Sequence, residues 1–365
     1  MKKWLSWLLT GALLLGILIL GACSGGGGGG GSEESAAPEE QQETETNEEE
    51  VVSDGIQERT IKVGNGHNES NPQSQGMIKF KELVEERSGG KITVNLYFDA
   101  TLGDDLQMTE ALQAGTQEMT IPSTSPLTGI VPEFGIFDFP FIINNEEEAD
   151  ALLDGPIGQK VMDLLDEHGL VGLGYWENGF RQMTNSKVPI EKAEDFQGLK
   201  IRTMQNEIHL EAFKRFGANP TPMAFSEVFT ALENKTIDGQ ENPLPTIRSS
   251  KFYEVQPYLT ISNHVYTPYI VLFSKKIWDE MSEEEQTLIR EAAIEAGQYQ
   301  RQLNREENLA SLEYLKEQGM TVTELSDEER AKLQELVRPV IDEFAQKINP
   351  ELVEEMFQEL EKIRN

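Results

Sequence analysis

From about Thr60 onward, stretches with an apolar residue at every second position alternate with stretches in which apolar residues recur at helical spacing. The stretch KITVNLYF (residues 91–98) alternates apolar and polar side chains, which predicts a half-buried strand. Residues 71–90, just before it, have apolar positions at helical spacing between an Asn-Pro start and a Gly-Gly end, which predicts a helix. Further strands are expected in LVGLGYW, GFRQMTN, GLKIRTM, TIDGQENP and HVYTPYIVLFS, with helices between them. Strands that alternate with helices predict an α/β fold.

One helical pattern is much longer than the others. Ser282 and Glu285 form a capping box, and apolar residues then recur at helical spacing to about Lys316. A helix of about 35 residues would be roughly 50 Å long, which exceeds the width of one small domain. We therefore expect this helix to run across two domains. The alternative is two helices that are broken at Gly297.

The charge balance restricts the partners. The 365 residues include 31 Lys and Arg against 64 Asp and Glu, a formal net charge of -33. Such a surface would repel nucleic acid and anionic lipid headgroups. No nucleic-acid partner is therefore expected.

The first residues have the pattern of a targeting segment. Three residues with two lysines precede an apolar run, which ends in Leu-Gly-Ala before Cys23. Small residues at that point indicate a signal peptide over residues 1–22. The Leu-Gly-Ala-Cys motif also resembles a bacterial lipobox, in which the cysteine is lipidated and holds the protein on the outer face of the cell membrane. The alternative is a plain anchor helix with an incidental cysteine. Residues 23–57, rich in Gly and Glu, are expected to be a disordered tether.

The sequence has no pattern that nominates an enzyme, a cofactor or a metal. The four histidines are far apart, and the single cysteine belongs to the lipobox. The stretch GNGHNES lacks the third glycine of a dinucleotide fingerprint, and there is no P-loop and no Gly-x-Ser-x-Gly elbow. We expect no cofactor and no metal.

Two arginines occupy similar places in predicted strands. Arg202 lies in GLKIRTM and Arg181 in GFRQMTN, and each follows a glycine and an apolar neighbour. A guanidinium can hold a carboxylate through two parallel hydrogen bonds. Phe225 before a helix and Asn242 before a proline could cover an apolar flank and fix the orientation of a ligand. Taken alone, either arginine is better explained as a surface or ion-paired residue.

The body of the chain resembles the substrate-binding proteins of tripartite ATP-independent periplasmic (TRAP) transporters, from about Thr60 to at least Arg305. The resemblance is carried by LQAGTQEM, GFRQMTN, DFQGLKIRTM, GANPTPMAFSEVFTAL, DGQENPL and KFYEVQPYLT, which occur in order. It implies a two-lobed periplasmic-binding-protein-like fold, with a long helix that spans both lobes. Lobe I is expected over residues 58–177 and 268–308, and lobe II over residues 178–267 and 309–365.

The resemblance also implies a function and a site. The two lobes would close over a small organic acid and deliver it to a membrane permease, which takes it up with an ion gradient and without ATP. Arg202 matches the principal carboxylate clamp of the family. The other positions that match family contacts are Arg181, Asn242, Phe225 and Gln205.

The identity of the acid follows less directly. The first-lobe stretch IPSTSPL supplies Ser123 and no charge, unlike the segment that grips sialic acid in sialic acid binders. Glu69 in GHNES is the candidate for an acidic residue of ectoine binders, which lack the arginine of GFR. We expect a polyhydroxylated monocarboxylate, a sugar acid such as a hexuronate, ahead of a C4-dicarboxylate and an ectoine-like zwitterion. A secreted enzyme that acts on acidic sugars and a ligand-sensing adaptor are the alternatives from other classes.

Overall fold

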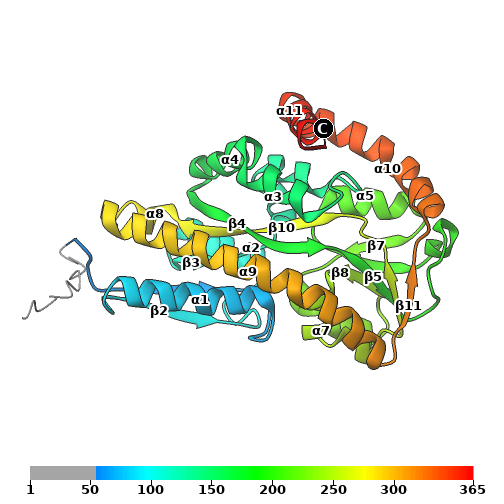
Figure 1. Ribbon diagram of the computed structural model, residues 1–365, viewed down its shortest axis with the longest axis horizontal. Helices are drawn as coiled ribbons and strands as arrows, with labels where there is room; N and C mark the ends of the chain where they lie inside the picture. Colours follow the sequence, from blue (N-terminus) through cyan, green and yellow to red (C-terminus); the bar gives the residue numbers. More distant parts are fainter. Residues whose placement is uncertain (1–54, 365) are drawn as a thin grey trace, which may run out of the picture. The chain divides into compact units, whose positions relative to one another are not determined.

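The computed structural model describes residues 55–364, which form two lobes that are each built on one β-sheet (Figure 1). The first-lobe sheet has the strand order β2-β1-β3-β10-β4. Its strands are β1 (Arg59–Gly64), β2 (Ile92–Tyr97), β3 (Met119–Thr120), β4 (Leu170–Phe180) and β10 (Tyr266–Ser274). The second-lobe sheet has the order β11-β9-β5-β8-β6-β7. Its strands are β5 (Gln182–Asn185), β6 (Lys200–Thr203), β7 (Asn219–Pro222), β8 (Gly239–Asn242), β9 (Tyr258–Ile261) and β11 (Thr321–Glu324).

Helices cover these sheets, and eleven of those described are α-helices. The first-lobe and connecting helices are α1 (Pro72–Arg87), α2 (Asp105–Ala114), α3 (Glu146–Asp154), α4 (Pro156–Asp163), α8 (Lys275–Trp278) and α9 (Glu283–Glu317). The remaining ones are α5 (Glu207–Arg215), α6 (Val228–Glu233), α7 (Leu244–Ser249), α10 (Asp327–Ile348) and α11 (Pro350–Arg364). The α/β class predicted from the alternating periods is confirmed.

The first strand-helix-strand unit forms as its pattern predicts. The Asn71 side chain caps α1, since its Oδ1 accepts a hydrogen bond from the Gln73 backbone N–H at 2.9 Å. The apolar stripe of α1 is buried against the sheet through Met77, Phe80, Leu83 and Val84. Strands β1 and β2 then pair in parallel, so that both carboxyl ends lie at the same edge of the sheet.

The second-lobe sheet contains two buried strands that are unusually polar. All four residues of β5 and all four of β8 are buried, and the two strands pair antiparallel. Thr184 accepts a hydrogen bond from Gln240 Nε2 at 2.9 Å and donates one to Gln256 Oε1 at 3.1 Å. Buried polar side chains need such partners, because an unpaired one costs free energy.

The chain passes between the lobes twice in adjacent extended segments. β4 runs directly into β5, and β9 leads into β10, which pairs antiparallel with β4 along its whole length. At the crossing, the Arg181 backbone N–H donates to the Val265 carbonyl oxygen at 3.0 Å. Together with α9, which leads from β10 and α8 to β11, these two segments connect the lobes covalently.

Helix α9 spans both lobes, as the sequence predicts (Figure 1). It has 35 residues, and the capping box of Ser282 and Glu285 is present. It contacts α1 of the first lobe and α7 of the second. The alternative of two helices is wrong, because the helix continues through Gly297, where the ring of Trp176 packs against the helix backbone.

The last two helices return toward the first lobe. α10 packs on α5, and α11 packs on α3 and α4, as the red end of the chain in Figure 1 shows. Arg364 near the end of α11 forms an ion pair with Glu148 of α3, with Nη2 and Oε2 2.7 Å apart. The lobe boundaries expected from the resemblance stay a prediction.

The signal peptide, the lipidation at Cys23 and most of the tether fall outside the described residues. Within residues 55–364, no helix is both long enough and apolar enough to cross a membrane.

Candidate functional site

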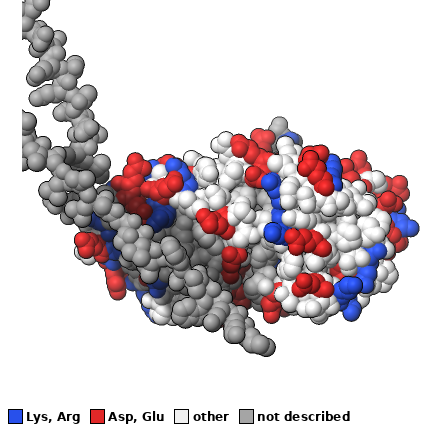
Figure 2. All heavy atoms as spheres, turned by 90° about the horizontal axis from the view of Figure 1, so that it is seen from below, with Lys and Arg blue, Asp and Glu red and all other residues white. Residues whose placement is uncertain are grey.

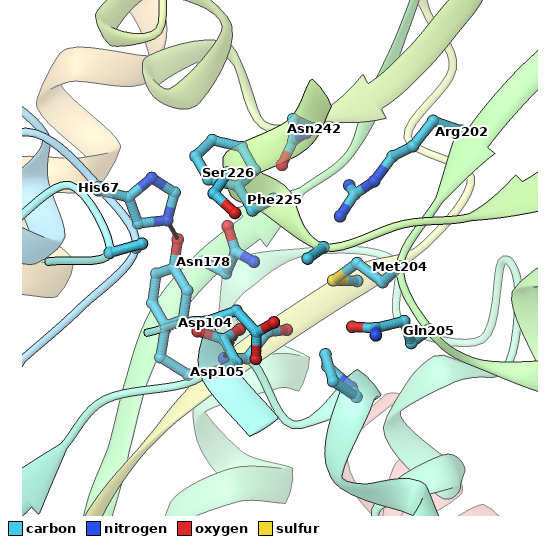
Figure 3. A pocket seen from close by; sticks show the side chains of 16 residues that line it. His67, Asp104, Asp105, Asn178, Arg202, Met204, Gln205, Phe225, Ser226 and Asn242 are labelled. Atoms are coloured by element: carbon cyan, nitrogen blue, oxygen red, sulfur yellow. Dashed lines mark hydrogen bonds between the residues drawn. The ribbon is translucent and has the colours of Figure 1, made fainter. Parts of the chain in front are cut away.

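A pocket lies between the lobes, at the carboxyl ends of the parallel strands of both sheets (Figure 3). Most first-lobe lining residues follow β1, β2 and β3, while Asn178 lies in β4 and Tyr269 in β10. Second-lobe lining residues lie at or follow the ends of β6, β7 and β8. This edge is where ligands bind in α/β folds, because the loops there are free to vary on a fixed frame.

Arg202 enters the pocket from the end of β6. The residue is 2 % exposed, and its Nε and Nη2 both donate to the Met223 carbonyl oxygen, at 3.0 and 2.7 Å. Nη1 is buried without a hydrogen-bond partner among the described residues. Burial lowers the pKa of Arg202 to about 10, so the side chain remains a cation at neutral pH. The fixed guanidinium therefore presents an unused pair of N–H groups to an anion.

Arg181 lies between β4 and β5 in the chain, and it is not part of the pocket lining but lies behind it. Its side chain is 0 % exposed and forms an ion pair with the equally buried Glu241. Nη2 donates to Glu241 Oε1 at 2.9 Å, and Nε donates to the other carboxylate oxygen. Burial alone would raise the pKa of Glu241, but Arg181 and a hydrogen bond from His264 hold it well below its usual value. The charge of Arg181 is thus already neutralised within the protein.

Asn242 links this ion pair to the pocket. Its side chain is part of the lining, and its Oδ1 accepts a hydrogen bond from Arg181 Nη2 at 3.1 Å. Its Nδ2 donates to Gln240 Oε1. The orientation of the Asn242 amide in the pocket is therefore set by two buried neighbours.

Aromatic side chains from both lobes meet at one end of the pocket. The rings of Phe225, which follows β7, and His67, which follows β1, lie 4.6 Å apart between centroids. The Tyr269 hydroxyl is 2.7 Å from His67 Nε2. Burial, with a smaller contribution from Arg181, lowers the pKa of His67 to about 3, so the imidazole is neutral at neutral pH. This end of the pocket is aromatic and uncharged.

Three further polar side chains face the pocket from the first lobe. Ser123 Oγ and Asn178 Oδ1 are buried without hydrogen-bond partners in the described part of the chain. Asp105, the first residue of α2, accepts a hydrogen bond at Oδ2 from the Ser123 backbone N–H at 3.3 Å. Burial raises the pKa of Asp105 to about 7, with the hydrogen bond from Ser123 opposing the shift.

The structure brings most of the residues expected from the sequence to this pocket. The expected residues that line it are Arg202, Asn242, Phe225, Gln205 and Ser123. Arg181 lies behind the wall, as described above. Glu69 is exposed at the surface and is not part of the lining.

Sequence reasoning missed His67, Asp105, Asn178 and Tyr269. His67 comes shortly after β1, so its place at the carboxyl end of a strand was a usable signal. Asn178 is a polar residue near the end of the buried strand β4, which was a second signal. Asp105 gave no such signal. The chain has many acidic residues, and an aspartate at the start of a helix normally serves to stabilise the helix N-terminus.

Figure 2 shows the distribution of charge on one face of the molecule. Acidic and basic side chains are intermixed there, and basic side chains form no continuous patch on the visible described residues. Within residues 55–364, no three His, Cys, Asp or Glu side chains are grouped so as to hold a metal ion.

Comparison with known proteins identifies the family. Residues 63–347 match the model of the DctP family, described as bacterial extracellular solute-binding protein, family 7. The sugar acid binding protein DctPAm of Advenella mimigardefordensis, solved in complex with galactonate, is 47% identical. That structure superposes with a TM-score of 0.83 over 84% of this chain and 99% of its own. A TRAP periplasmic solute-binding protein of Polaromonas sp. JS666, solved bound to D-erythronate, is 39% identical, with a TM-score of 0.79 over 82% of this chain and 98% of its own.

A curated relative agrees with these structures. The 2,3-diketo-L-gulonate-binding periplasmic protein YiaO of Escherichia coli is 37% identical over 73% of this chain and 81% of its own length. The chain therefore belongs to the DctP family of extracytoplasmic solute-binding proteins of TRAP transporters, which are binders of organic acids and not enzymes.

Proposed function

We propose that this protein captures a sugar acid, a hexuronate or an aldonate, and hands it to a TRAP permease. In this proposal Arg202 holds the ligand carboxylate, Asn242 and Gln205 orient the ligand, Phe225 covers its apolar face, and Ser123 pairs with a hydroxyl. No chemical step on the ligand is involved.

The observation that carries the proposal is the unused Nη1 of Arg202. A buried cationic N–H group without an acceptor is costly, and a bound carboxylate removes that cost. Because Met223 fixes the other side of the guanidinium, little side-chain entropy is lost when a ligand binds. The same pocket supplies the unpartnered Ser123 Oγ and Asn178 Oδ1, which suit ligand hydroxyls.

The setting of Arg181 supports a monocarboxylate over a C4-dicarboxylate. Two free arginines could each hold one carboxylate, but Arg181 is paired with Glu241. We therefore assign Arg181 a positioning role, in which it orients Asn242. The known ligands of similar proteins, galactonate and D-erythronate, are also hydroxylated monocarboxylates.

Ligand capture would be coupled to closure of the lobes. Cross-lobe contacts are already present: Asn71 Nδ2 donates to Ser249 Oγ at 3.1 Å, and Asn68 Nδ2 donates to the Ser249 carbonyl oxygen at 2.8 Å. A ligand that touches both lobes binds the closed state better and shifts the population toward it. The closed form would then be recognised by the permease.

A binding screen tests this proposal. The protein is unfolded and refolded to remove carried ligand, and its thermal unfolding is followed with hexuronates, aldonates, sialic acid, C4-dicarboxylates and ectoine. Ligand at 100 times its Kd adds about 2.7 kcal/mol, which moves the midpoint by several degrees. A shift with a hexuronate or an aldonate supports the proposal. A shift with only a C4-dicarboxylate or ectoine refutes the assigned ligand class, and turnover of an acidic sugar would refute the binding role.

We also propose that Cys23 carries the lipid anchor. The support is the lipobox pattern and the small residues before the cysteine. Cys23→Ser should move the protein from the membrane fraction to the soluble fraction and leave its ligand affinity unchanged. Retention of this variant on membranes would refute the anchor.

A further inference from the structure

Asp105 places a carboxylate inside the pocket. The residue is partly exposed and belongs to the pocket lining. Oδ2 accepts the hydrogen bond from the Ser123 backbone N–H, and Oδ1 has no hydrogen-bond partner in the part of the chain that the structure describes. Figure 3 shows Asp105 entering the pocket from the side opposite Arg202. A ligand held by Arg202 at one end therefore presents its other end to Asp105.

The neighbouring Asp104 is the N-cap of α2, a role that Asp105 does not have. Asp104 caps α2: its Oδ1 accepts the Gln107 backbone N–H at 2.9 Å, and the Gln107 side chain accepts the Asp104 backbone N–H at 3.0 Å. With the cap made by Asp104, α2 does not need Asp105 to satisfy its first N–H groups. The Asp105 carboxylate is therefore free to act on a ligand.

The groups around Asp105 supply hydrogen bonds but little positive charge. Ser123 and Asn178 are neutral, and His67 is neutral because its pKa is lowered to about 3. Arg202 is the cation of the lining, and its unused Nη1 is assigned to the ligand carboxylate. A second carboxylate near Asp105 would thus face a like charge in a poorly solvated space, where repulsion is strong.

We propose that Asp105 is a specificity-determining residue, which accepts hydrogen bonds from hydroxyls at the distal end of the ligand and rejects ligands with a second carboxylate there. The ionised Asp105 carboxylate has only acceptors, so in that form it pairs with hydroxyl donors and not with another carboxylate. Specificity of this kind combines an attractive contact with a repulsive one. The inference rests on the proposed function, because Arg202 must hold the first carboxylate.

Matched ligand pairs test Asp105 directly. Galactonate and galactarate differ only at the distal end, where galactarate has a second carboxylate in place of a hydroxymethyl group; D-erythronate and meso-tartrate form the equivalent four-carbon pair. Titration calorimetry on the refolded full-length protein, at a pH well above the Asp105 pKa of about 7 so that the side chain is ionised, gives the affinity for both members. We expect the wild-type protein to bind the dicarboxylate at least about tenfold more weakly than the monocarboxylate. In Asp105→Asn, binding of the monocarboxylate should weaken and the ratio of the two affinities should fall close to one.

The control is Glu110→Gln, which removes one negative charge from the exposed face of the same helix and should leave both affinities and their ratio unchanged. A wild-type protein that binds both members of a pair equally, or an Asp105→Asn variant that keeps the wild-type ratio, overturns the role of Asp105 while the binding of a sugar acid stands. A wild-type protein that binds no sugar acid overturns the proposed function, and the inference with it.

Discussion

Arg181 and Glu241 form an ion pair in which neither side chain has any exposed surface, with Nη2 and Oε1 2.9 Å apart. The pair joins the segment between β4 and β5 to β8, and through Asn242 it reaches the pocket. The ion pair therefore links the segment where the chain passes from one lobe to the other with the ligand site.

Breaking this pair should be costly. Arg181→Met leaves the Glu241 carboxylate buried and uncompensated, so we expect the free energy of unfolding to fall by about 3 to 5 kcal/mol. The double variant Arg181→Met, Glu241→Gln should recover a large part of the loss. Urea unfolding measures both. The control is Glu355→Gln, which breaks the exposed pair with Lys160 and should cost less than about 1 kcal/mol. A loss of that small size in Arg181→Met would contradict the role assigned to the pair.

Gly297 should not tolerate alanine, although alanine is normally the better helix former by about 1 kcal/mol. An added Cβ would lie 2.6 Å from Trp176 Nε1, which donates to the Ala293 carbonyl oxygen at 3.1 Å. We expect Gly297→Ala to destabilise the protein by about 1 to 3 kcal/mol because the ring or the helix must move. Gln302→Ala on the exposed face of the same helix should have little effect or stabilise slightly. An increase in the melting temperature of Gly297→Ala would contradict this packing.

Replacing Asp105 should stabilise the ligand-free protein at alkaline pH. The folded-state pKa is raised from 3.8 to about 7, so the unfolded chain releases this proton more readily than the folded protein does. The carboxyl group therefore makes the folded state progressively less stable as the pH rises from about 4 to about 7. Because part of the side chain faces the pocket, we expect a gain of only about 1 to 3 kcal/mol for Asp105→Asn above pH 7, with little gain near pH 4.

Unfolding by urea at pH 4.5 and at pH 8 measures this difference. Glu110→Gln, on the exposed side of α2, is the control and should show no such dependence on pH. If Asp105 served mainly to stabilise the helix terminus, Asp105→Asn would be the less stable protein at pH 8. That outcome would contradict the view that the site keeps a costly charge for ligand binding.

The sequence predicted the parts of the fold that depend on local pattern. The Asn71 cap, the apolar stripe of α1 and the capping box of α9 are each contained in a few neighbouring residues, and each is present. The continuous helix α9 was also predicted, but the packing of Trp176 on Gly297, which accounts for the glycine, was not, because these residues are far apart in the sequence.

For the site, too, the sequence predicted the residues that follow from local pattern and not those that depend on tertiary contacts. Arg202 and Asn242 lie at the ends of recognisable strands, and the pocket contains both. The setting of Arg181 was not predictable, since its partner Glu241 is supplied by the antiparallel pairing of β5 with β8. Asp105 was hidden by composition, because only the tertiary structure separates it from the many solvated acidic residues.

The central claim is that Arg202 holds the carboxylate of a sugar acid. The most direct test is titration calorimetry of the refolded wild-type protein and of Arg202→Gln with galactonate and D-erythronate, and with galactitol and erythritol, which lack the carboxylate. We expect the wild-type protein to bind an acid and not the corresponding alditol. Arg202→Gln should lose about 2 to 5 kcal/mol, or roughly 30-fold to several thousand-fold in affinity. An alditol that binds as tightly as its acid, or an unchanged Kd in Arg202→Gln, would contradict the account.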